Sequence, residues 1–382
     1  QEHNLSVNGG SQKIQFYLSA NYLGQEGLLR YGGDDYKRYS FTSKINAQLA
    51  DWASVNVSTK FLRGDQSQPT YLTENTRLFF NELSRKWPVT PRNYEHGGYT
   101  STSRIIPLED GGRYKSQNDY LYQQLQLVLE PIKNWKLFGE VNYRVHNKNE
   151  HTEILETSEL GIDGINSQIE GVAGYAKGLT RITENYYKEN FLNTNLYTEY
   201  SHTFASGHNL KALVGFNAEL SKDRDLKAYK EGLITPSLPT IDTATGLEKI
   251  QSGGYDQWAT AGFFGRLNYN YNDRYMAELN LRYDGTSRFL EAKRWNWFPS
   301  VSAGWNIARE AFMESTNSWL GSLKLRVSYG QLGNQNTESL YPFYSLMNIT
   351  AGGGNWLLNG AKPDKVLPAA LISKYLTWEK VE

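Results

Sequence analysis

The sequence predicts an all-β protein, a transmembrane antiparallel β-barrel, and three observations support this prediction. Apolar and polar residues alternate at every second position over runs long enough for the ~9–11 residues with which a tilted strand crosses a bilayer. Tight turns alternate with long polar loops along the chain. The 382 residues include 27 Tyr, 15 Phe and 10 Trp but only 11 Pro and 3 Met, which favours strands over helices.

The clearest alternation runs from Tyr39 to Leu49. Phe41, Ile45 and Leu49 share its apolar side, and Lys44 lies on its polar side. Similar runs occur at residues 121–129, 137–145, 210–220, 261–271, 275–283 and 323–329. The pattern predicts about twelve strands in hairpin order, with one face toward lipid and the other toward a wet lumen. A further strand is expected to start within Leu376–Glu382.

Tight turns and long loops are expected to lie at opposite rims of the sheet. The tight turns are predicted at Asn8–Ser11, Ala50–Trp52, Ile132–Trp135, Ala205–Asn209 and Asn272–Arg274. The long loops are predicted at Gly64–Asn118, His146–Thr183, Lys222–Asp256 and Gly333–Tyr375. Several Trp residues fall at strand ends, where an amphipathic ring suits the bilayer interface or simply packs a turn: Trp52, Trp135, Trp295, Trp297 and Trp319.

Several kinds of chemistry lack support in the sequence. Forty basic residues balance forty acidic ones, which argues against nucleic-acid binding, and the absence of Cys removes disulfides and thiolate sites. The H-E-x-x-H, Walker and G-x-G-x-x-G motifs are all missing. His146 and His151 are predicted to flank a solvated loop rather than to bind a metal. We therefore expect no enzymatic activity, no catalytic residues, no metal site and no cofactor.

Three consecutive segments resemble the SusC/RagA family of TonB-linked outer-membrane transporters. They are YDGTSRF at Tyr283–Phe289, FPSVSAGWNIARE at Phe298–Glu310 and LKLRVSYGQLGNQN at Leu323–Asn336. The resemblance implies that residues 1–382 are part of a plugged barrel of about 22 strands in the outer membrane of a Gram-negative bacterium. The plug is then expected before Gln1 and the closing strands after Glu382.

The same resemblance implies a function and partners. The family imports large nutrients, here oligosaccharides (glycans) or peptides, with energy supplied by TonB through the plug and with a SusD-like lipoprotein as an outer lid. Two alternatives stay open: a passive outer-membrane porin that shares the barrel, and a soluble β-rich surface protein that binds or hydrolyses glycans. The soluble alternative requires shorter strands, because soluble strands average ~5–6 residues.

Substrate contact is predicted in the loop Gly64–Asn118. Loops of this length are uncommon without a function, and aromatic rings and guanidinium groups suit sugars and peptides alike. The predicted contact residues are Trp87, Arg92, Tyr94, Tyr99 and Arg104. In the alternative, a short helix containing Leu78, Phe79, Leu83 and Trp87 packs the loop onto the barrel or its lid.

Overall fold

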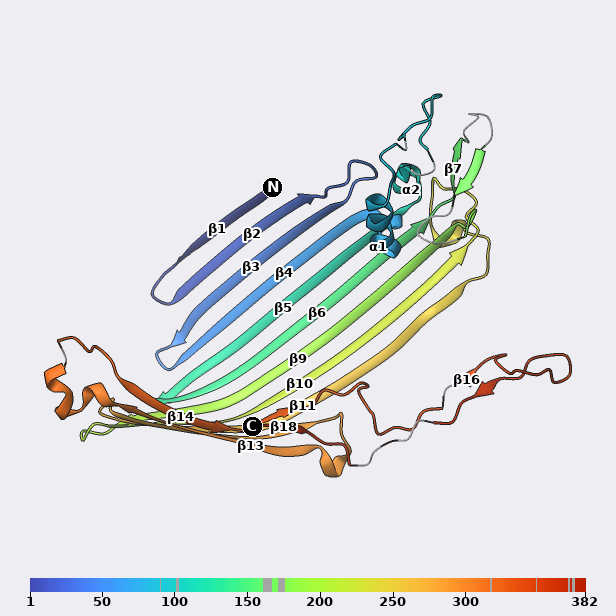
Figure 1. Ribbon diagram of the computed structural model, residues 1–382. Helices are drawn as coiled ribbons and strands as arrows, with labels where there is room; N and C mark the ends of the chain where they lie inside the picture. The colour runs from blue at the N-terminus through green and yellow to red at the C-terminus, as the bar shows by residue number, and fades with distance from the viewer. Residues whose placement is uncertain are drawn as a thin grey trace.

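One antiparallel sheet of twelve strands dominates the computed structural model (Figure 1). The structure describes residues 1–89, 91–100, 103–160, 167–170, 176–316, 318–347, 349–369, 372 and 375–382. In sheet order the strands are β1 (Glu2–Gly10), β2 (Ile14–Glu26), β3 (Asp35–Ala50), β4 (Ala53–Pro69), β5 (Arg113–Ile132), β6 (Trp135–Ile154), β9 (Arg181–Thr203), β10 (His208–Glu231), β11 (Lys249–Tyr271), β12 (Tyr275–Thr286), β13 (Trp295–Asn306) and β14 (Lys324–Gly330). The predicted number of strands and their hairpin order are confirmed.

Shorter elements lie outside this sheet. They are helices α1 (Thr70–Ser84) and α2 (Ile105–Glu109), the 3-10 turns η2 (Ile241–Thr243), η3 (Glu291–Lys293), η4 (Ile307–Arg309) and η5 (Ala311–Thr316), and the small strand pairs β7 (Thr157–Leu160) with β8 (Ser167–Glu170), β15 (Leu332–Asn334) with β18 (Glu379–Val381) and β16 (Ile349–Thr350) with β17 (Lys365–Val366). β18 confirms the strand expected within Leu376–Glu382. Among the described residues, no helix has the length and apolar character needed to span a membrane.

The outer face of the sheet carries the apolar half of the alternation. Cross-strand pairing places Phe16 beside Ile45, Ile45 beside Val57, and Val57 beside Leu125, so apolar residues form continuous rows. These side chains are not covered: Ile45 is 40% exposed and Leu125 is 50% exposed. An exposed apolar surface that crosses many strands is the feature expected of a lipid-facing wall.

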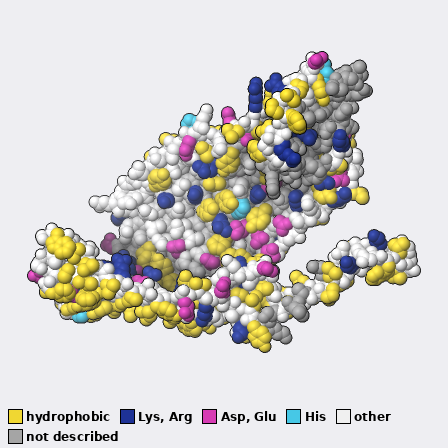
Figure 2. Space-filling view, in the orientation of Figure 1, with side chains coloured by type: hydrophobic (Ala, Val, Ile, Leu, Met, Phe, Trp, Pro, Cys, Tyr) yellow, Lys and Arg dark blue, Asp and Glu magenta, His cyan; other side chains and the backbone are white. Residues whose placement is uncertain are grey.

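The inner face carries polar side chains that are hydrogen-bonded across the strands. The Asn56 amide donates to Gln126 Oε1 at 2.8 Å, and the Gln126 amide donates to Glu140 Oε2 at 3.0 Å. The Asn217 amide continues the row by donating to Asn195 Oδ1 at 2.6 Å. Figure 2 turns this concave face toward the viewer: charged side chains are scattered over it, and hydrophobic ones gather along the lower edge near β13 and β14.

Four of the five predicted tight turns are confirmed, and the first is displaced: the predicted Asn8–Ser11 lies mostly within β1, and the turn itself joins Gly10 to Ile14. Between β11 and β12, Asn272 and Asp273 have φ of 48° and 53°, so both central residues of the turn are left-handed. A turn with positive φ at both central residues fits the twist of the flanking strands, and Asn and Asp tolerate this backbone better than other non-glycine residues. All five turns lie at one rim of the sheet, because they close the successive hairpins β1–β2, β3–β4, β5–β6, β9–β10 and β11–β12, and the connections between these hairpins lie at the other rim.

The boundaries of the first three predicted loops are wrong, because the strands continue several residues further. The fourth, Gly333–Tyr375, agrees to within three residues with the connection between β15 and β18, residues 335–378. β4 and β5 pair as far as Pro69 and Arg113, β6 and β9 as far as Ile154 and Arg181, and β10 and β11 almost as far, with Tyr229 opposite Lys249. Polar residues occupy both faces of these extensions, so the alternation that marks a strand is missing there. Backbone pairing and ion pairs hold them instead, such as Arg63 with Asp119 at 2.7 Å. Residues 161–166 and 171–175, within the second predicted loop, lie outside the described residues.

Candidate functional site

The longest described connection between sheet strands at the loop rim, residues 70–112, is anchored at both ends to β6. The Thr70 hydroxyl, which is fully buried, donates to the Glu153 carbonyl oxygen at 2.7 Å, and the Thr70 amide donates to the Gly112 carbonyl oxygen at 3.0 Å. Gly112 has φ of +96°, and a β-carbon there would lie 2.3 Å from the Glu153 carbonyl oxygen. Only glycine therefore fits this close approach.

Helices α1 and α2 pack this loop over the ends of β4, β5 and β6 (Figure 1). Their core contains Tyr71, Leu72, Phe79 and Leu108 together with Ile154 at the end of β6. The predicted short helix forms and Phe79 is buried as expected, whereas Leu83 is 53% exposed. Trp87 differs: it lies beyond the end of α1 and is 76% exposed, so it does not pack the helix onto the barrel.

Two of the five predicted contact residues meet around a residue that the sequence analysis missed. The Arg92 guanidinium donates to the Tyr31 hydroxyl at 3.0 Å, and the Tyr31 ring meets the Tyr99 ring edge to face at 6.0 Å. Tyr31 belongs to the connection between β2 and β3. A single Tyr in a short loop has no periodic pattern, so only the folded structure shows that it joins this group.

The other predicted contact residues lie apart from Tyr31. Tyr94 stacks on His96 at 5.2 Å within a turn, where the Tyr94 amide donates to the Gly98 carbonyl oxygen at 2.8 Å. Arg104 caps the start of α2 with a left-handed backbone, φ 58°. The structure thus groups Arg92 and Tyr99 with Tyr31 and places Tyr94 and Arg104 at separate structural positions.

A cavity of about 860 Å³ lies between the β2–β3 connection and the α1–α2 loop. Its apolar lining includes Leu29, Phe79 and Ile105, and its polar lining includes Arg30, Tyr31, Lys86 and Arg92. Ligand pockets of this size commonly combine an apolar floor with a few directed polar groups. The guanidinium and phenol groups can donate to hydroxyl, carbonyl or carboxylate oxygens of a ligand whose apolar part lies on the floor.

Aromatic residues also line the inner wall. The His146 ring stacks on Tyr120 with centroids 4.1 Å apart and meets Tyr187 at 5.3 Å. Next to them, the Arg144 guanidinium lies 4.9 Å from the centre of the Phe191 ring and donates to Glu189 at 2.8 Å. These residues lie on the polar face of β5, β6 and β9, so stacked rings and paired charges line this face.

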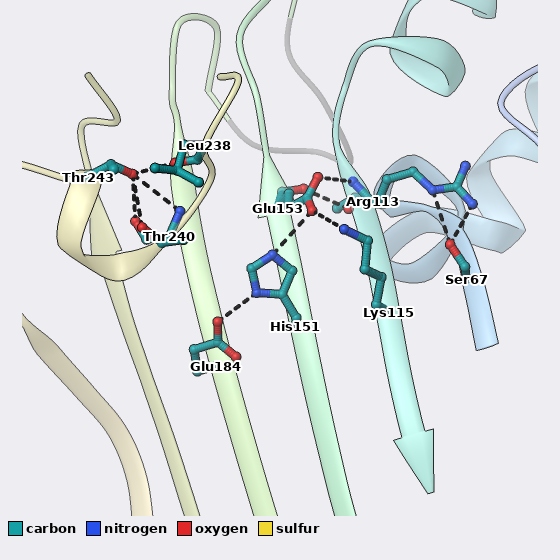
Figure 3. Close-up of polar contacts among 10 residues, drawn as sticks. Ser67, Arg113, Lys115, His151, Glu153, Glu184, Leu238, Thr240 and Thr243 are labelled. Carbon is teal, nitrogen blue, oxygen red and sulfur yellow. Dashed lines mark hydrogen bonds and ion pairs between the residues drawn. The ribbon is translucent and has the colours of Figure 1, made fainter. Parts of the chain in front are cut away.

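A charged cluster fixes the outer face of the strand extensions (Figure 3). Glu153 Oε1 accepts from Lys115 Nζ at 2.8 Å and lies 3.2 Å from His151 Nε2, while His151 Nδ1 lies 2.6 Å from Glu184 Oε1. The Arg113 amide donates to the second Glu153 oxygen at 3.1 Å. The expectation that His146 and His151 flank a solvated loop is therefore wrong, because both lie within β6, and His151 is bound on both ring nitrogens.

These contacts decide the protonation of the cluster, which lies beyond the apolar band. Hydrogen bonds to Glu153 and Glu184 raise the pKa of His151 to about 9. Burial opposes ionisation of Glu153, but hydrogen bonds from His151 and Lys115 outweigh it and lower its pKa to about 2. Both groups are charged at neutral pH, so the cluster acts as an electrostatic clamp between β5, β6 and β9.

Comparison with known proteins gives consistent matches. Residues 4–367 match the family described as TonB dependent receptor-like, beta-barrel. TonB-dependent receptor P26 of Formosa agariphila is 24% identical, with 98% of this chain and 36% of that protein covered. TonB-dependent receptor SusC of Bacteroides thetaiotaomicron is also 24% identical, with 99% of this chain and 38% of that protein covered.

Solved structures agree on the fold. The RagAB peptide importer in the 'open-open' state superimposes with a TM-score of 0.75 at 19% identity, over 99% of this chain and 40% of that chain. The chain spans between 33% and 38% of the length of the curated relatives it matches. The expected fold class, a transmembrane antiparallel β-barrel, and the resemblance to SusC/RagA are both confirmed. The chain belongs to the TonB-dependent receptor-like β-barrel family, whose members are outer-membrane receptors and transporters.

Proposed function

We propose that residues 1–382 form barrel wall, lumen lining and outer loops of an outer-membrane importer for oligosaccharides or peptides. The observation that carries the proposal is the opposite character of the two faces of the same strands. Apolar rows such as Ile45–Val57–Leu125 face outward, and the hydrogen-bonded row Asn56–Gln126–Glu140 faces inward. A wall with one lipid-compatible face and one wet face separates a membrane from a lumen.

The inner wall supports a gated importer more than an open pore. In the proposed whole protein, the amide and carboxylate row faces a plug that couples to TonB, and amide groups can hydrogen-bond to such a plug without a single-sign charge field. The stacked rings of Tyr120, His146 and Tyr187 then lie between the plug and the loop rim. A SusD-like lipoprotein is the proposed outer lid. The names of two relatives, SusC and the RagAB peptide importer, support this assignment.

We place substrate contact at the loop rim, with Arg92 and Tyr99 held beside Tyr31. The cavity there offers an apolar floor and donors on its rim, which suits a sugar ring or a peptide with an apolar side chain. Trp87, Tyr94 and Arg104 remain part of the proposed contact set at the same rim. Arg92 is the central residue of the proposal, because it combines a directed donor with a position beside the cavity.

The test replaces Arg92, Tyr94 and Tyr99 with Ala in the full-length transporter. After the amount at the cell surface is matched, growth on the cognate nutrient and binding by the purified transporter–lid complex are measured. Lys133→Ala, at a tight turn on the opposite rim, is the matched control. We expect the triple variant to lose affinity and uptake while the control keeps both. Unchanged uptake in the triple variant would place the substrate elsewhere, and conductance with the plug in place would identify a passive porin.

A further inference from the structure

A cluster of three cations lies on the outer face of β9 and β10, directly beyond the apolar band. Lys188 and Arg224 are cross-strand partners, and Lys222 precedes Arg224 by two residues on the same face. Every second residue of a strand lies on the same face, which places the three cations on the lipid side. Lys188 shares a face with Leu192, and Lys222 and Arg224 share one with Leu220. Like charges directly opposite each other destabilise a sheet. A compensating anion would therefore stabilise this pair.

Protein carboxylates do not supply that anion within the described part of the chain. None of the three cations forms an ion pair there, although Arg63 is paired with Asp119, Lys115 with Glu153 and Lys230 with Glu248. The neighbouring acids in sequence are on the inner face, since Glu189, Asp223 and Asp225 have the opposite parity. Glu184 shares the outer face but is bound to His151 at 2.6 Å.

The surroundings of the cluster are mostly polar and aromatic, with one aliphatic neighbour, Leu226, two residues beyond Arg224 on the same face. The Arg224 guanidinium lies 5.1 Å from the centre of the Tyr255 ring, its partner on β11. Asn190 and Gln257 are the cross-strand partners of Lys222, and Asn147 is the second partner of Lys188. Lys222, Arg224 and Tyr255 are exposed. The patch thus presents ammonium, guanidinium, amide and phenol groups to whatever surrounds the barrel at this height.

The distance of the cluster from the apolar band indicates which kind of anion can reach it. Leu192 and Leu220 are partners in the last aliphatic row below the cluster. At ~3.3 Å per residue, Lys222 lies about 7 Å and Lys188 and Arg224 about 13 Å further along the strands. This is the level at which lipid head groups meet a barrel, with Tyr side chains in the interfacial girdle. An anion that reaches the side of the barrel here belongs to a lipid.

We propose that Lys188, Lys222 and Arg224 form a binding site for the phosphate group of an anionic glycolipid in the outer leaflet. Phosphate offers several strong acceptor oxygens, and an ammonium and a guanidinium on adjacent strands can contact it together. The site rests on the outward orientation of the apolar face proposed above. Bound glycolipid cancels the repulsion between Lys188 and Arg224 and joins β9 to β10 on the lipid side.

The test uses the full-length transporter purified in non-ionic detergent and titrated with lipid A, a phosphorylated glycolipid, with binding followed by native mass spectrometry. At roughly fivefold per basic residue near a membrane surface, the K188Q/K222Q/R224Q variant should bind about 100-fold more weakly. The single variant R224K, which keeps the charge, should bind like the wild type. The control R63Q/D119N removes a paired cation from the same face and should also bind like the wild type.

Three further results decide the proposal. Dephosphorylated lipid A should bind the wild type as weakly as lipid A binds the triple variant. Inorganic phosphate that binds the wild type as tightly as lipid A would overturn the lipid source, and equal affinity of the wild type and triple variant for lipid A would overturn the site. If the triple variant does not assemble, K188Q alone, which relieves the like-charge pair, should still assemble and bind more weakly. If the barrel inserts into a membrane but does not bind lipid A at this site, only the lipid site is contradicted, and the outward orientation of the apolar face still holds.

Discussion

Each long strand has two regions with different side-chain patterns: the apolar band that faces the membrane, and the extension toward the long loops. In the band, Ile45 and its neighbours form apolar rows on the outside while Asn56, Gln126 and Glu140 are hydrogen-bonded on the inside. In the extensions, both faces are polar, and ion pairs such as Arg63–Asp119 and Lys115–Glu153 link adjacent strands. Alternating polarity therefore determines the structure of the band, whereas individual side-chain contacts determine that of the extensions.

The difference teaches where each region is vulnerable. In the band, any residue of the correct polarity preserves the wall, because lipid and water each accept many side chains. In the extensions, stability depends on particular contacts: ion pairs between adjacent strands, and the burial of single residues such as Ile154 under the α1–α2 loop. A change of polarity should therefore damage the band most, whereas a change of shape or protonation should damage the extensions.

The largest effect is expected from a charge placed on the outer face of the band. Ile45→Arg should lower the yield of folded full-length barrel, because Arg at the lipid-facing midplane of a barrel costs ~2–4 kcal/mol. Asn46→Arg, one position away on the wet face, should fold almost normally. Heat-modifiable migration after refolding into lipid measures both yields. Equal yields for the two variants would mean that the faces are assigned incorrectly.

A smaller effect is expected from a methyl group at the anchor of the α1–α2 loop. Gly112→Ala introduces a β-carbon 2.3 Å from the Glu153 carbonyl oxygen at a φ of +96°, so the loop attachment should weaken by about 1–3 kcal/mol. Gly97→Ala is the matched control, since Gly97 has a φ of +93° but open space around its β-carbon. Limited proteolysis should cleave the loop faster in Gly112→Ala than in Gly97→Ala. Similar rates would show that strain alone governs the loop.

The charged cluster should make the strand extensions sensitive to pH. His151 has a pKa raised to about 9, so its stabilising contribution is complete below its ordinary value near 6.5 and is lost as pH rises through 9. Glu153 has a pKa lowered to about 2, so its contribution is complete above its ordinary value near 4.5 and is lost as pH falls toward 2. Hydrogen-exchange protection at the ends of β5, β6 and β9, corrected for the intrinsic exchange rate, should therefore be highest between about pH 4.5 and 6.5.

His151→Gln supplies the control for this pH dependence. The variant keeps a hydrogen-bonding side chain but cannot carry the charge, so the loss of protection between pH 6.5 and 9 should disappear. The band residues should show no such pH dependence in either protein. A wild-type profile that is flat from pH 6 to 9.5 would contradict the clamp.

The smallest effect is expected at Trp87. Its side chain is 76% exposed beyond the end of α1, so Trp87→Ala should change the free energy of unfolding by less than about 0.5 kcal/mol. Thermal denaturation of the full-length protein measures this change. Phe79→Ala, which removes a buried ring from the loop core, should be clearly more destabilising. A reversed order would show that Trp87 packs against a surface and is not free for a ligand.

The sequence predicts the band well and the extensions poorly, for a physical reason. Alternation reports which side chains meet lipid, so the twelve strands and four of the five tight turns could be predicted from it. Beyond residues such as Val145 on β6 the side chains are polar on both faces, and the signal vanishes although the strand continues to Ile154, which is buried under the α1–α2 loop. Proximity between distant segments has no periodic signal at all. Tyr31 beside Arg92, and Lys188 opposite Arg224, follow only from the folded register.

The central claim, that one face of these strands meets lipid and the other water, can be tested directly by scanning β3 with spin labels. Residues 1–382 contain no Cys, so a single Cys at each position from 35 to 49 of the full-length barrel, with any Cys outside these residues replaced by Ser, can be labelled cleanly in bilayers. We predict that positions 41, 43, 45, 47 and 49 are accessible to oxygen and that positions 42, 44, 46 and 48 are accessible to a water-soluble nickel complex. Positions 35 to 38 should be accessible to nickel on both faces. Equal accessibility on the two faces within the band, or the reverse order, would contradict the account.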